Sequence, residues 1–250
     1  WWASRWRPQF FTRRSGTRSL LHFGANLTAG AFFYSLARGL DGLLIGRFYG
    51  AASVGLYSRA AAMLTRPLEQ IMSPIEAVFI PVFSRLQTEP ERFRRKFLEI
   101  YETIALASFL FTGMFFALAH PLTLVLLGPK WENAAVIFAC FSFAALAYPL
   151  GSCASWLLTS QGRGRDSLVA ASIVSVIIAA SFIVGLPFGP TGVALAYSVS
   201  ALLLQLPIYY WLVGRKGPVR TSDLWTAFLR QLPVWGVVAL VTWLVRLPIQ

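Results

Sequence analysis

The sequence predicts an all-α protein, a polytopic membrane bundle of about seven transmembrane helices. Hydrophobic residues make up 56% of the 250 residues and charged residues only 13%, whereas a soluble domain has roughly 25% charged residues. The apolar residues also form long blocks of about 20 residues or more, the length that a helix needs to cross a bilayer. Because backbone polar groups in lipid must be satisfied within each segment, the blocks are expected to be helices.

Seven apolar blocks define the expected spans, with residues 1–19 ahead of them as a separate basic segment and residues 20–248 as the bundle. In chain order the spans cover residues 20–46, 54–84, 97–127, 134–160, 166–186, 191–213 and 226–248. Turn-forming or charged sequence separates each span from the next: FYGAAS, SRLQTEPERFRRK, GPKWEN, QGRGR, LPFGP and GRKGPVRTSD.

The net charge of +12 is distributed unevenly between the loops. Sixteen of the 22 Lys and Arg fall in alternate gaps, at residues 1–19, 85–96, 163–165 and 215–230. The positive-inside rule therefore predicts a cytoplasmic N-terminus and a multi-pass protein of the bacterial cytoplasmic membrane. The basic residues are expected to meet anionic membrane lipids, and no nucleic acid is expected as a partner.

Catalytic and metal-binding patterns are missing from the sequence. Cys140 and Cys153 lie in one predicted span, and no Cys/His cluster has the spacing of a metal site. There is no phosphate-binding glycine loop and no nucleophile motif. We therefore predict no metal, no cofactor and no enzymatic activity.

Arg38 and Asp41 interrupt the first apolar block, where an ionisable residue at membrane depth marks a candidate functional site. The first two spans form a hairpin, in which Asp41 and Arg59 are each nine residues from Gly50 and therefore at similar depth. We expect Asp41 to face Arg38 within its helix and Arg59 across the hairpin. Two roles stay open: a structural clamp, or the lining of a hydrophilic cavity.

The second span carries a stripe of polar side chains within an arc of about 120°. Its members are Ser58, Arg59, Arg66, Glu69, Gln70, Ser73 and Glu76. We expect this stripe to face other helices or a water-filled cavity and the opposite side of the helix to face lipid. Pro67, Pro74 and Pro81 recur every seven residues and are expected to bend or loosen the helix, either for transport or only for packing.

Three aromatic residues, Trp131, Tyr148 and Trp156, lie near the ends or inside predicted spans. We interpret them as residues of the interfacial aromatic belt, with sugar stacking as the alternative.

The run DGLLIGRFYGAASVGLYSRA at residues 41–60 resembles the signature hairpin of the Wzx-type polysaccharide and lipid-linked oligosaccharide flippases, which belong to the multidrug/oligosaccharidyl-lipid/polysaccharide exporter superfamily. WRP at 6–8, PVFSRL at 81–86, LLGPKW at 126–131 and GPTGVALAYS at 189–198 resemble sequences at corresponding places in that family. The resemblance therefore runs along essentially the whole chain.

The resemblance implies one lobe of a two-lobe flippase whose central cavity opens alternately to the two sides of the membrane. The implied cargo is an oligosaccharide linked to a polyprenyl pyrophosphate, used to assemble lipopolysaccharide, capsule or exopolysaccharide. The residues expected to bind the pyrophosphate are Arg38, Arg59 and Arg66, and those expected to orient them or to couple transport to ions are Asp41, Glu69 and Glu76.

The chain departs from the family in one respect. Family members have two lobes, whereas this chain resembles the connection between the lobes plus the second lobe without its last helix. We therefore expect a piece of a longer protein, or a half whose first lobe comes from another chain, and no transport by this piece alone.

Two other functions remain open. One is an ion-coupled exporter of small organic compounds, and the other is a scaffold of polysaccharide assembly that transports nothing. Three arginines balance three carboxylates in the expected cavity, so charge does not decide between an anionic and a cationic cargo.

Overall fold

The computed structural model describes residues 17–234 and 236, and within them the chain is helical with no strand, which confirms the all-α prediction. The elements in order are α1 (Thr17–Arg85), η1 (Leu86–Thr88), α2 (Pro90–Ala117), α3 (Ala119–Leu127), η2 (Pro129–Trp131), α4 (Ala134–Ser142), α5 (Ala144–Ser160), α6 (Gly164–Gly185), η3 (Leu186–Phe188), α7 (Gly189–Ser200), η4 (Ala201–Gln205), α8 (Leu206–Gly214) and α9 (Thr221–Arg230).

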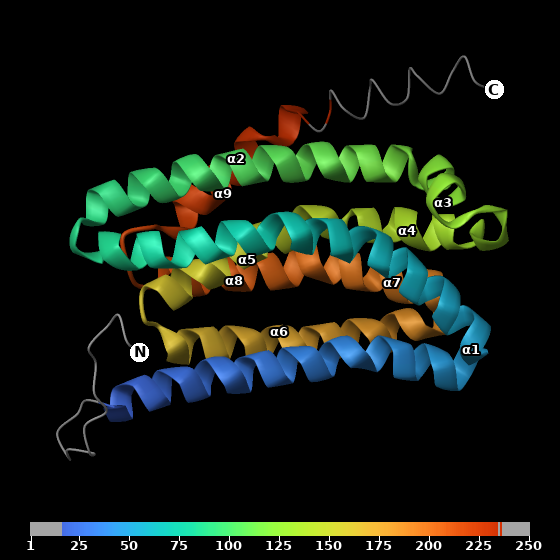
Figure 1. The fold of residues 1–250 in the computed structure, drawn as a ribbon, viewed down its shortest axis with the longest axis horizontal. Helices are drawn as coiled ribbons and strands as arrows, with labels where there is room; N and C mark the ends of the chain where they lie inside the picture. Colours follow the sequence, from blue (N-terminus) through green and yellow to red (C-terminus); the bar gives the residue numbers. More distant parts are fainter. Residues whose placement is uncertain (1–16, 235, 237–250) are drawn as a thin grey trace, which may run out of the picture.

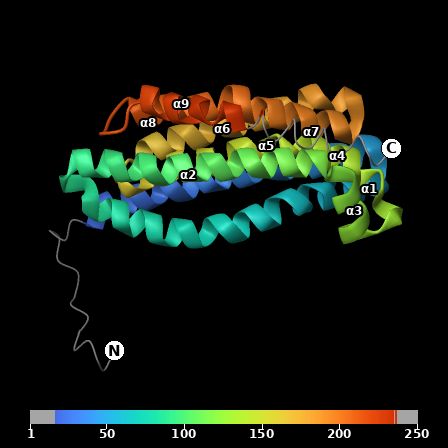
Figure 2. The same cartoon turned by 90° about the horizontal axis from the view of Figure 1, so that it is seen from above.

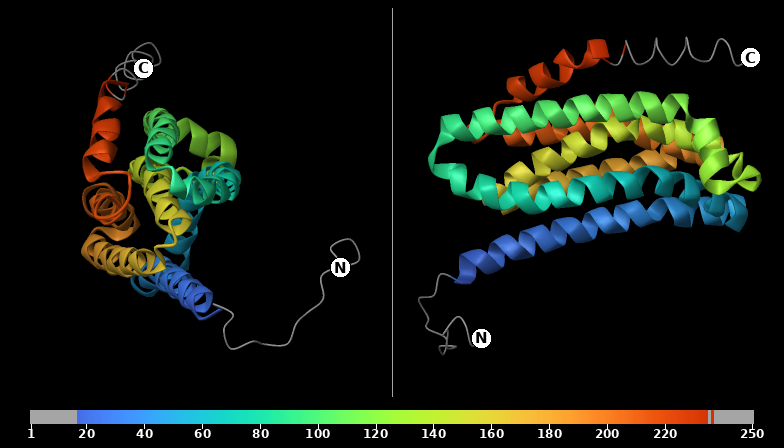
Figure 3. Two further views of the ribbon diagram at one scale, coloured as in Figure 1. Left: turned by 90° about the vertical axis from the view of Figure 1, so that its left-hand side faces the viewer. Right: turned by 45° about the horizontal axis from the view of Figure 1, so that its top comes forward.

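The helices run back and forth along one long axis, so all chain reversals gather at two ends of an elongated bundle (Figure 1). The start of α1 and the α1–α2, α5–α6 and α8–α9 connections lie at one end, which we call the basic end (Figures 1 and 2). The hairpin of α1, the α3–α4 connection and the α6–α7 connection lie at the other. In Figure 3 the left view looks along the long axis of the bundle, and the right view shows the same two ends obliquely. The alternate loops with excess Lys and Arg therefore share one end.

The predicted hairpin is confirmed, and it lies inside α1. Gly50 has φ 80° and ψ 172°, and it is the one residue with non-helical dihedral angles inside α1, which is described throughout. Only glycine adopts this conformation without a large steric cost. Pro67, Pro74 and Pro81 stay within the helical second half, so the hairpin depends on Gly50, and no proline breaks the helix.

The remaining spans follow the predicted order. α2 forms the third, and it ends at Ala117, before the predicted end at 127, where the short α3 turns away. α4 with α5 forms the fourth, α6 the fifth and α7 to α8 the sixth. Among the described residues, Pro90–Ala117 and Gly164–Gly214 are long and apolar enough to cross a membrane, and α4 with α5, bent by 44°, gives a third if counted together. The predicted seventh span begins in α9 and lies mostly outside the described residues, as does the basic segment at 1–19.

The basic end is held together by aromatic packing and by hydrogen bonds from arginines. The Phe79 and Phe83 ring centroids are 4.1 Å apart, and Phe83 packs on Phe93 of α2 at 5.0 Å. Arg163 donates to the carbonyl oxygens of Leu212 at 2.6 Å and Val213 at 3.1 Å, which satisfies acceptors at the end of α8. This loop arginine therefore has a structural role besides its expected part in topology.

Arg94 of α2 and Asp223 of α9 join two helices at the same end. The guanidinium donates two hydrogen bonds to the carboxylate, at 2.8 and 2.7 Å. These bonds hold the pKa of Asp223 below its ordinary value, so the link persists at neutral pH and is lost only as the pH falls through that lowered pKa.

α6 and α7 approach each other closely at Gly185. A Cβ atom there would lie 2.5 Å from the carbonyl oxygen of Gly192 and 2.7 Å from the Cα atom of Val193. Both are backbone atoms and cannot rotate away, so the crossing requires glycine at this position.

We predict that Gly185→Val destabilises the protein by about 1–3 kcal/mol, because the added side chain forces α6 and α7 apart. Thermal unfolding in detergent measures the effect. The matched control is Gly39→Val, because a Cβ at Gly39 meets nothing within 4 Å. Equal melting temperatures for the two variants would contradict the proposed close crossing.

Candidate functional site

The polar stripe predicted on the second half of α1 lies on the surface of the bundle. All seven of its members are exposed: Ser58, Arg59, Arg66, Glu69, Gln70, Ser73 and Glu76. Their helical spacing places them on one side of the helix. The bundle therefore presents a row of charged and polar side chains on its outer surface.

The opposite side of this helix was expected to face lipid, and that expectation is wrong for most of it. Leu64, Leu68 and Phe79 are buried, because they pack into the two hydrophobic cores of the bundle. Ile71 and Val78 are exposed and form a third, apolar side. The helix thus has a core side, an apolar exposed side and a polar exposed side.

Arg59 does not pair with Asp41. No ion pair within 4.0 Å joins them in the described part of the chain. The Arg59 guanidinium instead lies over the ring of Trp131, 5.6 Å from its centroid, and an Asp41 carboxylate oxygen accepts a hydrogen bond from the Gly42 backbone at 2.7 Å. The prediction of a charged clamp across the hairpin is therefore wrong.

Arg38 lies deeper in the bundle and is half-buried. Its guanidinium is 4.9 Å from the ring centroid of Tyr197 in α7 and interacts electrostatically with Asp41. Asp41 also interacts electrostatically with Tyr57. The Tyr57 hydroxyl is buried and makes no hydrogen bond of normal geometry within the described residues. Arg38 and Asp41 do lie together as predicted, but inside the lobe and next to tyrosines.

Arg66, Glu69 and Glu76 have no hydrogen bond or ion pair in the described part of the chain. Since each is exposed, their charges are available to a ligand, to water or to another chain. An unpaired charge at membrane depth is costly in contact with lipid. We therefore expect these three residues to meet water, a ligand or another chain.

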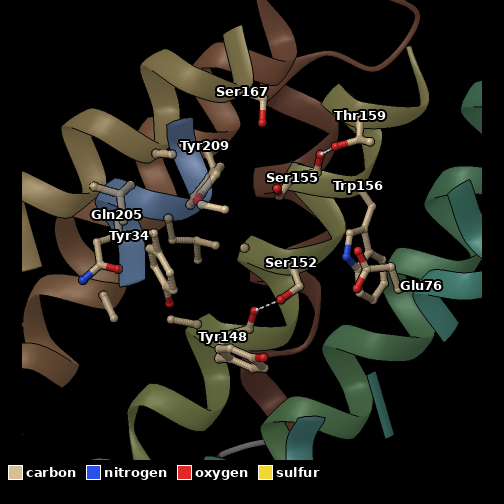
Figure 4. Close-up of a pocket in the computed structure, with 18 of the residues that line it drawn as sticks. Tyr34, Glu76, Tyr148, Ser152, Ser155, Trp156, Thr159, Ser167, Gln205 and Tyr209 are labelled. Atoms are coloured by element: carbon tan, nitrogen blue, oxygen red, sulfur yellow. Dashed lines mark hydrogen bonds between the residues drawn. The ribbon is translucent and has the colours of Figure 1, made fainter. Parts of the chain in front are cut away.

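A cavity of about 320 Å³ lies beside the stripe, between the first half of α1 and helices α5, α6, α7 and α8. Figure 4 shows Tyr34 and Tyr209 on one side of it and Trp156 and Glu76 on the other. The aromatic and polar residues that line it are Tyr34, Glu76, Tyr148, Ser152, Ser155, Trp156, Thr159, Ser167, Tyr197, Gln205 and Tyr209.

Sequence reasoning identified Glu76 as a site residue, left sugar stacking open as an alternative for Tyr148 and Trp156, and missed the other lining residues. Tyr148 and Trp156 were interpreted as belt residues, which is wrong for Trp156, since it is buried and lines the cavity. The spacing of α5 held a signal, because its polar and aromatic lining residues recur three or four positions apart and form one helical face. That face comprises Tyr148, Ser152, Ser155, Trp156 and Thr159.

Comparison with known proteins places the chain among polysaccharide biosynthesis proteins. The sequence model of the family described as "Polysaccharide biosynthesis protein" matches residues 1–136. The amylovoran biosynthesis protein AmsL of Erwinia amylovora is 27% identical over 212 residues, covering 82% of this chain and 54% of AmsL. The lipopolysaccharide biosynthesis protein WzxC of Escherichia coli (strain K12) is 21% identical over 233 residues, covering 91% of this chain and 47% of WzxC.

Among solved structures, the lipid II flippase MurJ in its inward closed conformation matches with a TM-score of 0.67 and 16% identity. The match covers 86% of this chain and 50% of MurJ, and it shows the fold. The chain therefore spans about half the length of the relatives that it matches.

We predict that water reaches the stripe in the membrane. In the complete protein with Cys140 and Cys153 replaced by Ala, Ser73→Cys should react with a membrane-impermeant maleimide, because Ser73 lies on the polar exposed side. Val78→Cys is the matched control on the apolar exposed side and should react at least about tenfold more slowly, because only the thiolate in water reacts. Similar rates at both positions would argue against a hydrated stripe.

Proposed function

We propose, from the premise that this chain belongs to the polysaccharide biosynthesis protein family, that it is one lobe of a membrane flippase. Its cargo is an oligosaccharide carried on a polyprenyl pyrophosphate, destined for lipopolysaccharide, capsule or exopolysaccharide. The observation that carries this proposal is the unpaired, exposed polar stripe of α1 on a lobe with the fold of a lipid II flippase. Such a stripe is stable at membrane depth only against water or polar ligand.

The arginines of the site are the pyrophosphate-binding groups. Arg66 is exposed and has no acidic partner, so its planar guanidinium is free to bind two phosphate oxygens at once. Arg59 lies over Trp131, which orients its guanidinium without neutralising it. Arg38 lies deeper, over Tyr197, and supplies a positive charge toward the middle of the lobe.

The carboxylates of the site have a different task. Asp41 lies near Arg38 and fixes its charge, since the two interact electrostatically. Glu69 and Glu76 are exposed and carry no ion pair in the described chain, so they are suited to binding a coupling ion or to keeping the cavity hydrated. The site holds and moves its cargo, and we assign it no bond-breaking step.

A second lobe completes the cavity. The chain spans about half of its relatives and half of MurJ, and its charged stripe lies open on the surface. We propose that the stripe faces the other lobe across a central cavity, which opens alternately to the cytoplasmic and outer sides of the bacterial cytoplasmic membrane. The basic end faces the cytoplasm, in keeping with the positive-inside rule.

Complementation tests this function. The complete gene should restore surface polysaccharide in a strain that lacks the corresponding flippase, and Arg66→Ala should reduce that polysaccharide by at least about tenfold, since a charged hydrogen-bond partner of phosphate is worth roughly 1.5–3 kcal/mol. Arg66→Lys should recover part of the loss.

The matched control is Arg92→Ala at the basic end, where Arg92 pairs with Glu89 at 3.2 Å in solvent. It should complement fully at equal protein level. Full complementation by Arg66→Ala together with Arg59→Ala would contradict the assignment and favour a scaffold without transport.

A further inference from the structure

The cavity beside the stripe holds polar groups that the protein leaves without partners. In the described chain, the hydroxyls of Tyr34, Tyr148 and Tyr209 make no hydrogen bond, and neither do those of Ser155 and Ser167. None of these five hydroxyl oxygens is fully buried. A hydroxyl can donate one hydrogen bond and accept two, so the cavity offers a dense set of both donors and acceptors.

Aromatic rings form much of the wall between these hydroxyls. Tyr34 and Tyr209 lie on one side and Trp156 on the other, with Ser152 and Ser155 between them along α5 (Figure 4). Cavities of this composition hold ligands by ring contact and orient them by a few polar groups. A ligand that fits must be flat and apolar on its faces and hydroxylated around its edge.

The charges around the cavity favour a neutral ligand. Glu76 is the charged side chain among its described lining residues. At the deeper end, the guanidinium of Arg38 lies over the ring of Tyr197, which lines the cavity. Arg38 thereby occupies a ring face that an organic cation would otherwise use, while Glu76 repels an anion. The lining is therefore negatively charged, which disfavours an anionic sugar relative to a neutral one.

The wall also contains an irregular helical turn. η4, between α7 and α8, is a five-residue π-helix that ends at Gln205, and Ala201, Gln205 and Leu206 line the cavity. Such turns are rare and occur often at functional sites. Pro207 lies two residues after its end and lacks a backbone donor, so the irregular turn stands next to a proline beside the cavity.

We infer that this cavity is a subsite for a single uncharged pyranose ring, separate from the arginines of the stripe. Its volume of about 320 Å³ lies at the small end of the roughly 300–1,000 Å³ of ligand pockets, which suits one sugar ring. One C–H face of the ring packs on Tyr209, and its hydroxyls bond to Tyr34 and Ser155. The subsite thus selects neutral sugars over uronic acids. The inference rests on the proposed function, because it assigns the ring to the cargo.

Ligand-observed NMR on the purified complete protein tests the subsite directly. The probes are methyl α-D-glucopyranoside and methyl α-D-galactopyranoside, the corresponding methyl glucuronoside as the acidic sugar, and tetraethylammonium as the organic cation. We expect weak, saturable binding of at least one neutral glycoside, with a dissociation constant of about 1–10 mM, and at least about tenfold weaker binding of the glucuronoside.

Three variants locate that binding. Ser155→Leu fills the cavity and should abolish it, whereas Thr103→Leu, an exposed hydroxyl on α2 outside the cavity, should leave it unchanged. Glu76→Gln should leave the affinity for the neutral glycoside within about threefold of the wild-type value. It should raise the affinity for the glucuronoside by about tenfold. Thermal unfolding of each variant confirms that it is folded.

Two results would overturn the inference. One is that no neutral glycoside binds, or that Ser155→Leu does not change the binding. The other is that tetraethylammonium binds at the same place more tightly than the glycosides, which would make the cavity an organic-cation site. Complementation by the Arg66 variant tests the stripe, and glycoside binding tests the cavity. The two proposals can therefore fail separately.

Discussion

The architecture of this lobe depends on one constraint: charged side chains at membrane depth must meet water, a partner or a polar ligand, because lipid solvates them poorly. The second half of α1 satisfies the constraint because it presents three sides with different surroundings. Leu64 and Leu68 pack into the bundle, Ile71 and Val78 form an apolar exposed side, and the charged stripe is exposed without an ion pair in the described chain. One side of the lobe therefore exposes charges that have no ion-pairing partner, and we place the transport pathway on that side.

Stripe and cavity meet at a single residue, Glu76, which belongs to the stripe and also lines the cavity. The same helix can therefore hold two chemically different parts of one amphiphilic ligand. Guanidinium groups on the stripe suit a pyrophosphate, whereas the rings and hydroxyls of the cavity suit an uncharged sugar. The two surfaces differ in access as well. The stripe is open along its length, whereas the cavity lies between α1 and helices α5 to α8 (Figure 4).

The sequence predicted those features that depend on local periodicity. Helical order, the hairpin at Gly50 and the membership of the stripe follow from apolar blocks, a turn sequence and a 100° repeat. The Asp41–Arg59 pair failed because equal distance from the turn fixes depth but not direction around each helix. The true neighbour of Arg59 is Trp131, more than seventy residues away in sequence. Most of the cavity was missed for a related reason, since the face of α5 becomes a cavity wall only where α1, α6, α7 and α8 pack around it.

The most direct test of this account is transport by the purified complete protein in proteoliposomes. A polyprenyl-pyrophosphate-linked oligosaccharide placed in the inner leaflet should become accessible to an external glycosidase only when the protein is present, and replacing Arg59 and Arg66 together by Ala should slow its appearance to the rate of empty liposomes. Equal rates for wild type and the double variant, or no transport by either, would contradict the claim that the stripe of α1 forms the pathway of a lipid-linked glycan.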